Sequence, residues 1–319
     1  MLGAVTGPRT DRPPHAGGNP HGKRDAIPRP SDPAPIPASL ADETGYLLRR
    51  AYVYAGRWAM AAMPDGVAIR DYEILQTLAD LGPRSQRRLS ELLWVNRTIM
   101  VKLIDALESD GLVERRRDLS DRRSYALELT PTGEHSRARL STLADEAEAG
   151  LTASLSARER TALRKLLSAI ALAADQSPEL PKGLAGRAGF LLTQAHNHVR
   201  ELTNARLRAL GITTALYGVL ATIARGPISQ QAIADQLGLT GPAIVQSVDR
   251  LEQAGLVERR RDLADRRSYA LRPTRDGRAV LRQAGTAIAQ IDDQLDRTLG
   301  TNQRRHELNR LLRKLLGAE

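Results

Sequence analysis

The chain contains a long internal repeat, and this repeat constrains its fold more than any other feature. Residues 111–127 read GLVERRRDLSDRRSYAL, and residues 255–271 repeat this segment with one change, Ala264 in place of Ser120. Further identical residues align at the same offset of 144 (255 − 111) without a gap: Gly45 with Gly189, Leu107 with Leu251 and Glu108 with Glu252. Solenoid units are only about 20 to 45 residues long, so this repeat is the duplication of a whole domain.

The repeat and the local composition divide the chain into four segments. Residues 1–40 are rich in Pro and Gly and poor in large apolar side chains, so we expect a disordered tail, or else a basic arm that touches DNA. Pro178 and Pro181 oppose helix continuation between the repeats and predict a linker there. The predicted segments are the tail (1–40), a first domain (41–174), the linker (175–185) and a second domain (186–319).

The charge of the chain points to a polyanionic partner. Lys and Arg total 47 against 37 Asp and Glu, which gives a formal net charge of +10. Nucleic acid fits this charge, although a membrane surface or an acidic protein would also attract it. The sequence has no long apolar run and no signal-peptide pattern, so we expect a cytoplasmic protein without a membrane partner. Cysteine is absent, which excludes disulfides, thiolate zinc sites and thiol redox sensors.

Periodicity predicts the same succession of elements in both repeats. Apolar residues at helical spacing indicate four helices, after which Gly111 and Gly255 stand where a C-terminal glycine is expected. The period then changes to alternation in VERRR and SYALEL, which predicts a two-stranded hairpin. Thr130 and Thr274 open a long helix, and a capping box at Ser156 opens a last one. The first four helices are expected at 44–63, 70–81, 85–93 and 96–109, and at 188–210, 214–225, 229–237 and 240–253.

Two helices joined by a short turn and followed by a charged hairpin form a winged helix-turn-helix, and the surrounding motifs resemble those of the MarR family. Each hairpin carries Asp-x-x-Asp-Arg-Arg, and the first is followed by Leu-x-Leu-Thr-x-x-Gly at residues 127–133. In the second copy Pro273 replaces the second leucine of this motif. The match covers about residues 41–174 and 186–316. The resemblance implies a mainly α fold with small β-hairpin wings, in which two tandem winged helix-turn-helix domains form an intramolecular pseudo-dimer.

The fourth helix of each repeat is the expected recognition helix, because a major groove admits an α-helix. Apolar residues at helical spacing predict its buried face, at Val95, Ile99, Leu103, Ile104 and Leu107 in the first copy and at Leu239, Ala243, Ile244, Val248 and Leu251 in the second. The opposite face carries the predicted DNA contacts, Asn96, Arg97, Thr98 and Lys102 in the first copy and Thr240, Gly241, Val245 and Gln246 in the second, where Arg250 is also exposed. Since Asn suits adenine and Arg suits guanine, the two helices are expected to read different bases.

Arginines at the tips of the two hairpins are expected to enter the minor groove, whose negative potential attracts cations. They are Arg122, Arg123, Arg266 and Arg267, and Asp121 and Asp265 are expected to orient them because phosphate repels a carboxylate. The arginine triplets at 115–117 and 259–261 alternate faces along a strand, so only some of these side chains can reach phosphate. A solvated strand would also explain the triplets.

The resemblance also implies a small-molecule effector site between the first helices and the DNA-binding lobe. The candidate residues are Tyr46, Tyr52, Trp58 and Tyr72 in the first repeat and Phe190, His196, His198 and Arg200 in the second. Packing between helices is the simpler explanation of these aromatic residues. Side chains two apart on a helix diverge, so His196 and His198 cannot share one metal ion, and we expect neither a metal nor a cofactor.

Taken with the resemblance, these features predict a sequence-specific double-stranded DNA-binding transcription regulator, a ligand-responsive repressor that reads an imperfect palindrome as a monomeric pseudo-dimer. Its partners would be an operator DNA and a small-molecule effector. The alternative is a protein-interaction scaffold without base readout. In the first repeat, the exposed Asn96, Arg97 and Lys102 argue against a scaffold. In the second repeat, Gly241 and Pro242 argue against it less strongly. We do not expect an enzyme, since no convergent polar constellation is visible.

Overall fold

The computed structural model describes residues 27–33, 35–36, 40–117, 125–174, 179–226, 228–261 and 269–318, in two compact units whose border does not coincide with the border between the repeats. The first unit comprises Met1–Ser31, Ala55–Ala153 and Ala174–Leu191, and the second comprises Asp32–Tyr54, Ser154–Ala173 and Leu192–Glu319. Two segments of the first repeat therefore pack with the second repeat.

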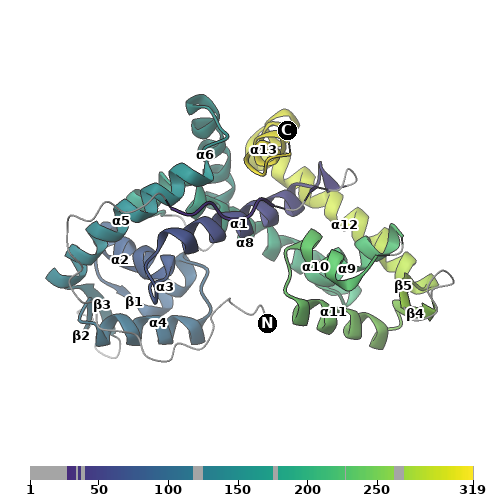
Figure 1. The fold of residues 1–319 in the computed structure, drawn as a ribbon, viewed down its shortest axis with the longest axis horizontal. Coiled ribbons are helices and arrows are strands. Elements are labelled where there is room, and N and C mark those ends of the chain that lie inside the picture. Colours follow the sequence, from purple (N-terminus) through teal and green to yellow (C-terminus); the bar gives the residue numbers. More distant parts are fainter. Residues whose placement is uncertain are drawn as a thin grey trace. The chain divides into compact units, whose positions relative to one another are not determined.

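The first unit holds the helix-turn-helix and the wing of the first repeat (Figure 1). Its elements are the C-terminal part of α1 (Thr44–Ala62), α2 (Ile69–Leu81), β1 (Arg84–Ser85), α3 (Gln86–Leu92), α4 (Arg97–Ser109), β2 (Val113–Arg117), β3 (Tyr125–Leu129), α5 (Pro131–Leu151), α7 (Lys182–Ala185) and the start of α8 (Ala188–Leu207). The three strands are antiparallel in the order β1-β3-β2. Val113 pairs with Leu129 and Arg117 with Tyr125, which sets the register of the wing.

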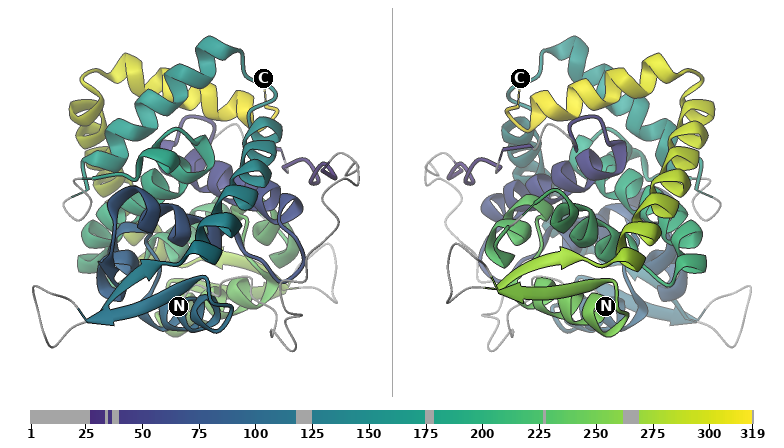
Figure 2. Two further views of the ribbon diagram at one scale, coloured as in Figure 1. Left: turned by 90° about the vertical axis from the view of Figure 1, so that its left-hand side faces the viewer. Right: turned by 90° about the vertical axis from the view of Figure 1, so that its right-hand side faces the viewer.

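The second unit holds the helix-turn-helix and the wing of the second repeat, together with helices from the first. Its elements are the N-terminal part of α1, α6 (Ala157–Leu172), most of α8, the 3-10 helix η2 (Arg208–Leu210), α9 (Thr214–Ala224), α10 (Gln230–Leu237), α11 (Gly241–Gln253), β4 (Val257–Arg261), β5 (Tyr269–Pro273), α12 (Arg275–Leu299) and α13 (Asn302–Leu315). Strands β4 and β5 form an antiparallel hairpin (Figure 2). Val257 lies opposite Pro273, which is the register that β2 and β3 have.

Local sequence explains where these helices begin and end. Ser85 and Ser229 cap the first helix of each helix-turn-helix, because the side-chain oxygen of each accepts a backbone N–H of the first turn. Ser156 and Glu159 form the capping box expected for α6. Past the ends of the recognition helices, Gly111 and Gly255 adopt φ of +68° and +69°, the left-handed region that glycine enters without a steric penalty.

Each helix-turn-helix surrounds a small apolar core. In the second unit Ile233, Ile244 and Val248 have no exposed surface, and Tyr46 of α1 packs against this cluster. In the first unit Leu89 is fully buried in the same way. The cores bury one face of each recognition helix and leave the opposite face to solvent.

The structure confirms the mainly α fold with small β-hairpin wings and the order of elements predicted from the sequence. The ends of the first four helices of each repeat agree with expectation to within one residue, except that α8 ends at Leu207 and continues as η2. The expectation missed the two-residue strand β1 and the one-turn helix α7, which lies inside the predicted linker. Among the described residues no single helix is long and apolar enough to cross a membrane; α8 with η2 and α9 pass such a test only as a pair bent by 73°.

Candidate nucleic-acid interface

Helix α4 presents the predicted polar face of the first repeat to solvent. Arg97, Thr98 and Lys102 are exposed, and so is Val101. The opposite side is buried at Leu103, Ile104 and Leu107 as predicted, and at Met100, which the prediction omitted; Ile99 is half-buried. The face is thus free to approach a groove while the core holds the helix.

Asn96 has a structural role in addition to its predicted contact with DNA. It is the N-cap of α4, and its Oδ1 accepts a hydrogen bond of 2.8 Å from the backbone N–H of Ile99. The side chain is exposed, but a bidentate contact with adenine requires both the Oδ1 and the Nδ2 atoms. In the capped conformation Nδ2 is the atom of this amide that can face a base. Asn96 therefore positions the first turn of α4 at least as much as it offers a base contact.

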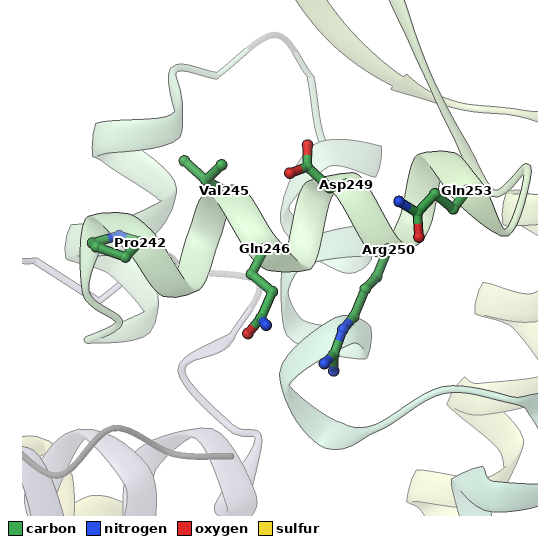
Figure 3. A pocket seen from close by; sticks show the side chains of 6 residues that line it. All are labelled: Pro242, Val245, Gln246, Asp249, Arg250 and Gln253. Atoms are coloured by element: carbon green, nitrogen blue, oxygen red, sulfur yellow. The ribbon is translucent and has the colours of Figure 1, made fainter.

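Helix α11 exposes a chemically different face in the second repeat. Thr240, Gly241, Val245, Gln246 and Arg250 are all exposed, as predicted. A shallow pocket runs along this face, and Figure 3 shows its lining residues, Pro242, Val245, Gln246, Asp249, Arg250 and Gln253. The N-cap Thr240 makes no side-chain capping hydrogen bond. The face therefore offers an amide, a hydroxyl and a small apolar surface near its N-terminus, and its cation lies two turns further on.

An exposed valine occupies the same place on both recognition helices. Val101 is 41% exposed and Val245 is 45% exposed, and the two are 144 residues apart. An apolar side chain on such a face can contact the methyl group of thymine. The prediction named Val245 and omitted Val101, although the repeat itself would have identified the equivalent position.

The first arginine of each wing triplet turns toward the recognition helix. Arg115 of β2 pairs with Asp105 at 2.7 Å and with Glu108 at 3.4 Å, both on α4. Arg259 of β4 pairs in the same way with Asp249 at 3.3 Å and with Glu252 at 2.9 Å on α11. This conserved geometry between the repeats links the wing to the recognition helix. The first arginine of each triplet therefore forms ion pairs with the recognition helix. The alternation of faces along the strand did not predict which arginine of the triplet would do so.

The remaining wing positions are only partly described. Arg116 pairs with Glu114 at 2.6 Å and with Glu128 at 3.0 Å, and Arg117 is exposed. The predicted tip residues all lie outside the described residues: Asp121, Arg122, Arg123, Asp265, Arg266 and Arg267. Their expected roles at the minor groove stay predictions.

The residues proposed for an effector site divide between the two units. Trp58, Tyr72 and Phe190 are buried in the first unit, and Tyr46, Tyr52, His196, His198 and Arg200 belong to the second. In the first unit, the Tyr72 ring lies under the Arg187 guanidinium, with 5.2 Å from Cζ to the ring centroid. The assignment of these residues to an effector site stays a prediction.

Tyr52 and His196 form a stacked pair in the second unit. Their ring centroids are 4.8 Å apart and their planes differ by 18°. Burial, and then the positive charges of Arg49 and Arg200, lower the pKa of His196 to about 3, so its imidazole is neutral at physiological pH. Among the described residues no group of three or more His, Asp or Glu side chains could hold a metal ion.

Two family models match the chain, both described as MarR family, at residues 68–125 and 210–268. A Thauera aromatica protein named as a transcriptional regulatory protein for the hcr operon is 32% identical over 145 residues, which cover 45% of this chain and 87% of that protein. The chain belongs to the MarR family. It carries two tandem MarR-type domains and is a transcription regulator with DNA-binding winged helices.

Solved structures of MarR-family proteins are similar to parts of this MarR-family chain. The transcriptional repressor CouR bound to a 23-mer DNA duplex is 33% identical, with 41% of this chain and 93% of that chain covered and a TM-score of 0.38. The Mycobacterium tuberculosis MarR family protein Rv2887 in complex with p-aminosalicylic acid is 27% identical, with 40% and 96% covered and a TM-score of 0.35.

Proposed function

We propose that this chain is a cytoplasmic, ligand-responsive repressor that binds an imperfect palindromic operator, with α4 in one half-site and α11 in the other. The observation that carries the proposal is the pair of recognition helices, which share a buried scaffold and differ on the exposed face. The activity that we propose is DNA binding, and the proposal includes no catalytic step.

The exposed faces predict unequal reading of the two half-sites. Arg97 and Lys102 of α4 are a bidentate donor and a point charge, and they correspond to Gly241 and Gln246 of α11. A good bidentate pairing with a base contributes about 1 to 3 kcal/mol of discrimination. The half-site under α11 should therefore tolerate more mismatches than the half-site under α4.

Anchoring to the DNA backbone should be similar on the two sides. Both wings keep the Asp-Arg-Arg sequence, and both have the same brace to the recognition helix, through Arg115 and Arg259. We assign Arg122, Arg123, Arg266 and Arg267 to minor-groove and phosphate contacts, with Asp121 and Asp265 as their orienting partners.

A single chain should supply both modules of the pseudo-dimer. The packing of α6 from the first repeat with α12 and α13 from the second, inside one compact unit, supports this proposal. Paired winged helices read half-sites about one helical turn apart, roughly 34 to 36 Å. A ligand would relieve repression if it binds the DNA-free state more tightly than the DNA-bound state.

Selection from randomised duplex DNA tests the proposal. The wild-type chain should select a site in which one half carries clearly more sequence information than the other. Arg97→Ala should then relax only the more stringent half, and Gln246→Ala should relax only the other. A symmetric selected site, or relaxation of both halves by either variant, would contradict the proposed assignment of helices.

A further inference from the structure

Helix α1 of the first repeat places one row of side chains on the helix-turn-helix of the second repeat, inside the second unit. The row consists of Tyr46, Arg49, Arg50 and Val53, and we call these residues the α1 row. Their spacing of i, i+3, i+4 and i+7 puts them on one face of the helix. They meet the C-terminal end of α10 and Gly238, where the chain turns toward the recognition helix α11.

Arg49 makes the central contact of the α1 row. Its Nε donates to the carbonyl oxygen of Leu237 at 2.8 Å, and its Nη2 donates to the carbonyl oxygen of Gly238 at 3.0 Å. The last carbonyl groups of a helix have no partner within the helix and carry a partial negative charge. A planar guanidinium satisfies two successive carbonyls at once and compensates their charge, which a shorter polar side chain cannot do.

The other members of the α1 row reinforce this contact. The Tyr46 hydroxyl and the Arg50 Nη1 both donate to the carbonyl oxygen of Gln236, at 3.0 and 3.1 Å, and Arg50 also donates to the Tyr46 hydroxyl at 2.9 Å. Val53 packs against Gly238, since a Cβ added there would lie 3.4 Å from Val53 Cγ2. Three consecutive carbonyl groups at the end of α10 thus accept hydrogen bonds from α1.

The contact acts on the start of the recognition helix. Only Leu239 separates Gly238 from Thr240, the N-cap of α11, and that N-cap makes no side-chain capping hydrogen bond. In the first repeat Asn96 supplies this bond for α4 from within its own helix-turn-helix. The start of α4 is therefore held by a residue of its own helix-turn-helix, whereas the turn before α11 is held by residues of α1.

The second repeat does not carry the same row. At the same offset, α8 has Phe190, Thr193, Gln194 and Asn197 in place of Tyr46, Arg49, Arg50 and Val53. None of these four side chains carries a positive charge or a guanidinium fork. The turn differs as well, because Trp94 with φ of +53° stands where the second repeat has Gly238 with φ of +59°. The hydrogen-bond donors of the α1 row and Gly238 thus have no equivalents at the matching positions, so this contact is specific to the helix-turn-helix of the second repeat.

We propose that Arg49, supported by Tyr46 and Arg50, is a positioning residue for the second recognition helix, so that the first repeat sets how strictly α11 discriminates bases. The proposal rests on the proposed function, because it assumes that α11 reads DNA. Arg49 itself contacts no base. It acts by holding the turn that precedes α11.

Amide hydrogen exchange of the free protein tests the restraint without DNA. Arg49→Thr installs the residue that α8 has at the matching position, and amides at 238–244 should then exchange about tenfold faster, because charge-assisted hydrogen bonds are lost. Amides at 94–100 should exchange at the wild-type rate. Arg57→Thr, the same change two turns along α1, is the matched control and should leave both segments unchanged. Unchanged exchange at 238–244 in Arg49→Thr would overturn the proposal.

A second measurement asks whether the restraint serves base reading. We would compare the affinity for the selected operator with that for operators carrying one changed base pair in either half-site. In Arg49→Thr the penalty for a change under α11 should fall at least about threefold, while the penalty under α4 stays as in the wild type. Arg49→Lys keeps the charge at the end of α10 and should restore part of the discrimination.

The outcomes separate the two proposals. If both penalties fall equally, or neither falls, the positioning role is overturned even where the exchange rates change. If the wild-type chain shows no base discrimination in either half-site, the proposed function fails, and the exchange result alone decides whether Arg49 restrains the turn. Should Arg49→Thr not fold, Arg49→Lys decides, since one ammonium cannot match two carbonyls and should still speed exchange at 238–244.

Discussion

Gly133 and Gly277 occupy the same place in the two repeats, in the first turn of α5 and of α12. A Cβ at either glycine would lie closer than 3.0 Å to a backbone carbonyl oxygen, that of Leu112 or of Leu256. The threonine three residues earlier caps the helix and also donates to the carbonyl oxygen of the glycine after the recognition helix, at 2.7 Å in both repeats. The Thr-x-x-Gly motif thus joins the long helix to the end of the recognition helix.

Substitution of Gly133 by Ala should therefore destabilise the first unit. The added methyl group has to displace backbone, so we expect the free energy of unfolding to fall by about 1 to 3 kcal/mol. Chemical denaturation followed by circular dichroism measures it. Gly285→Ala in α12 is the matched control, because nothing lies within 4 Å of its Cβ position and alanine favours a helix. Equal stability of Gly133→Ala and the wild type would show that the backbone yields at little cost.

At the scale of elements, α1 and α8 meet in the second unit at the stacked rings of Tyr52 and His196. The pKa of His196 lies at about 3 because burial, and then Arg49 and Arg200, disfavour its charged form. The pKa of histidine in an unfolded chain is about 6.5. Between these values the unfolded chain binds more protons than the folded one, so lowering the pH favours unfolding.

The stability of the chain should accordingly depend on pH through His196. Its contribution is fully present above pH 6.5 or so and is lost as the pH falls toward 3, with a slope of at most about 1.4 kcal/mol per pH unit. Denaturation curves between pH 7 and pH 5 measure this slope, in a range where most carboxylates stay ionised. In His196→Gln the slope should be smaller; a slope equal to that of the wild type would assign the pH dependence to other groups.

At the scale of the whole molecule, each repeat contributes helices to the second unit. Glu159 at the start of α6 pairs with Lys314 at 2.9 Å and with Arg310 at 3.1 Å, both on α13. Hydrogen bonds from Lys314, from the Ser156 backbone and from Arg310 lower the pKa of Glu159 to about 2. Leu163 and Leu167 of α6 are fully buried. The long helices of the two repeats thus already have partners within one chain.

We therefore expect the free protein to be a monomer. Sedimentation equilibrium at nanomolar to micromolar concentration should give a mass near 34.8 kDa. The same mass should bind one operator duplex, because a single chain holds α4 and α11. A stable dimer of chains at nanomolar concentration would show instead that the functional unit contains four winged helices.

Local patterns in the sequence determined much of this protein. The 144-residue repeat predicted two copies of one domain, and helical periodicity with capping residues predicted the ends of the first four helices of each repeat to within one residue, apart from the end of α8. The exposed faces of α4 and α11 followed from the same periodicity, because burial of one side of a helix leaves the other side to solvent. Strand β1 and helix α7 escaped prediction since two and four residues are too short to show a period.

Only the tertiary structure decided which groups these side chains meet. Oδ1 of Asn96 caps α4, and Arg115 turns from the wing to α4, although both residues suit DNA by type. Arg49 lies 188 residues from Leu237 along the chain, yet it holds the end of α10. Periodicity reports which face of an element is buried and carries no information on its distant partner. That partner is set by the packing of whole helices, in which α1 and α6 of the first repeat join the second repeat.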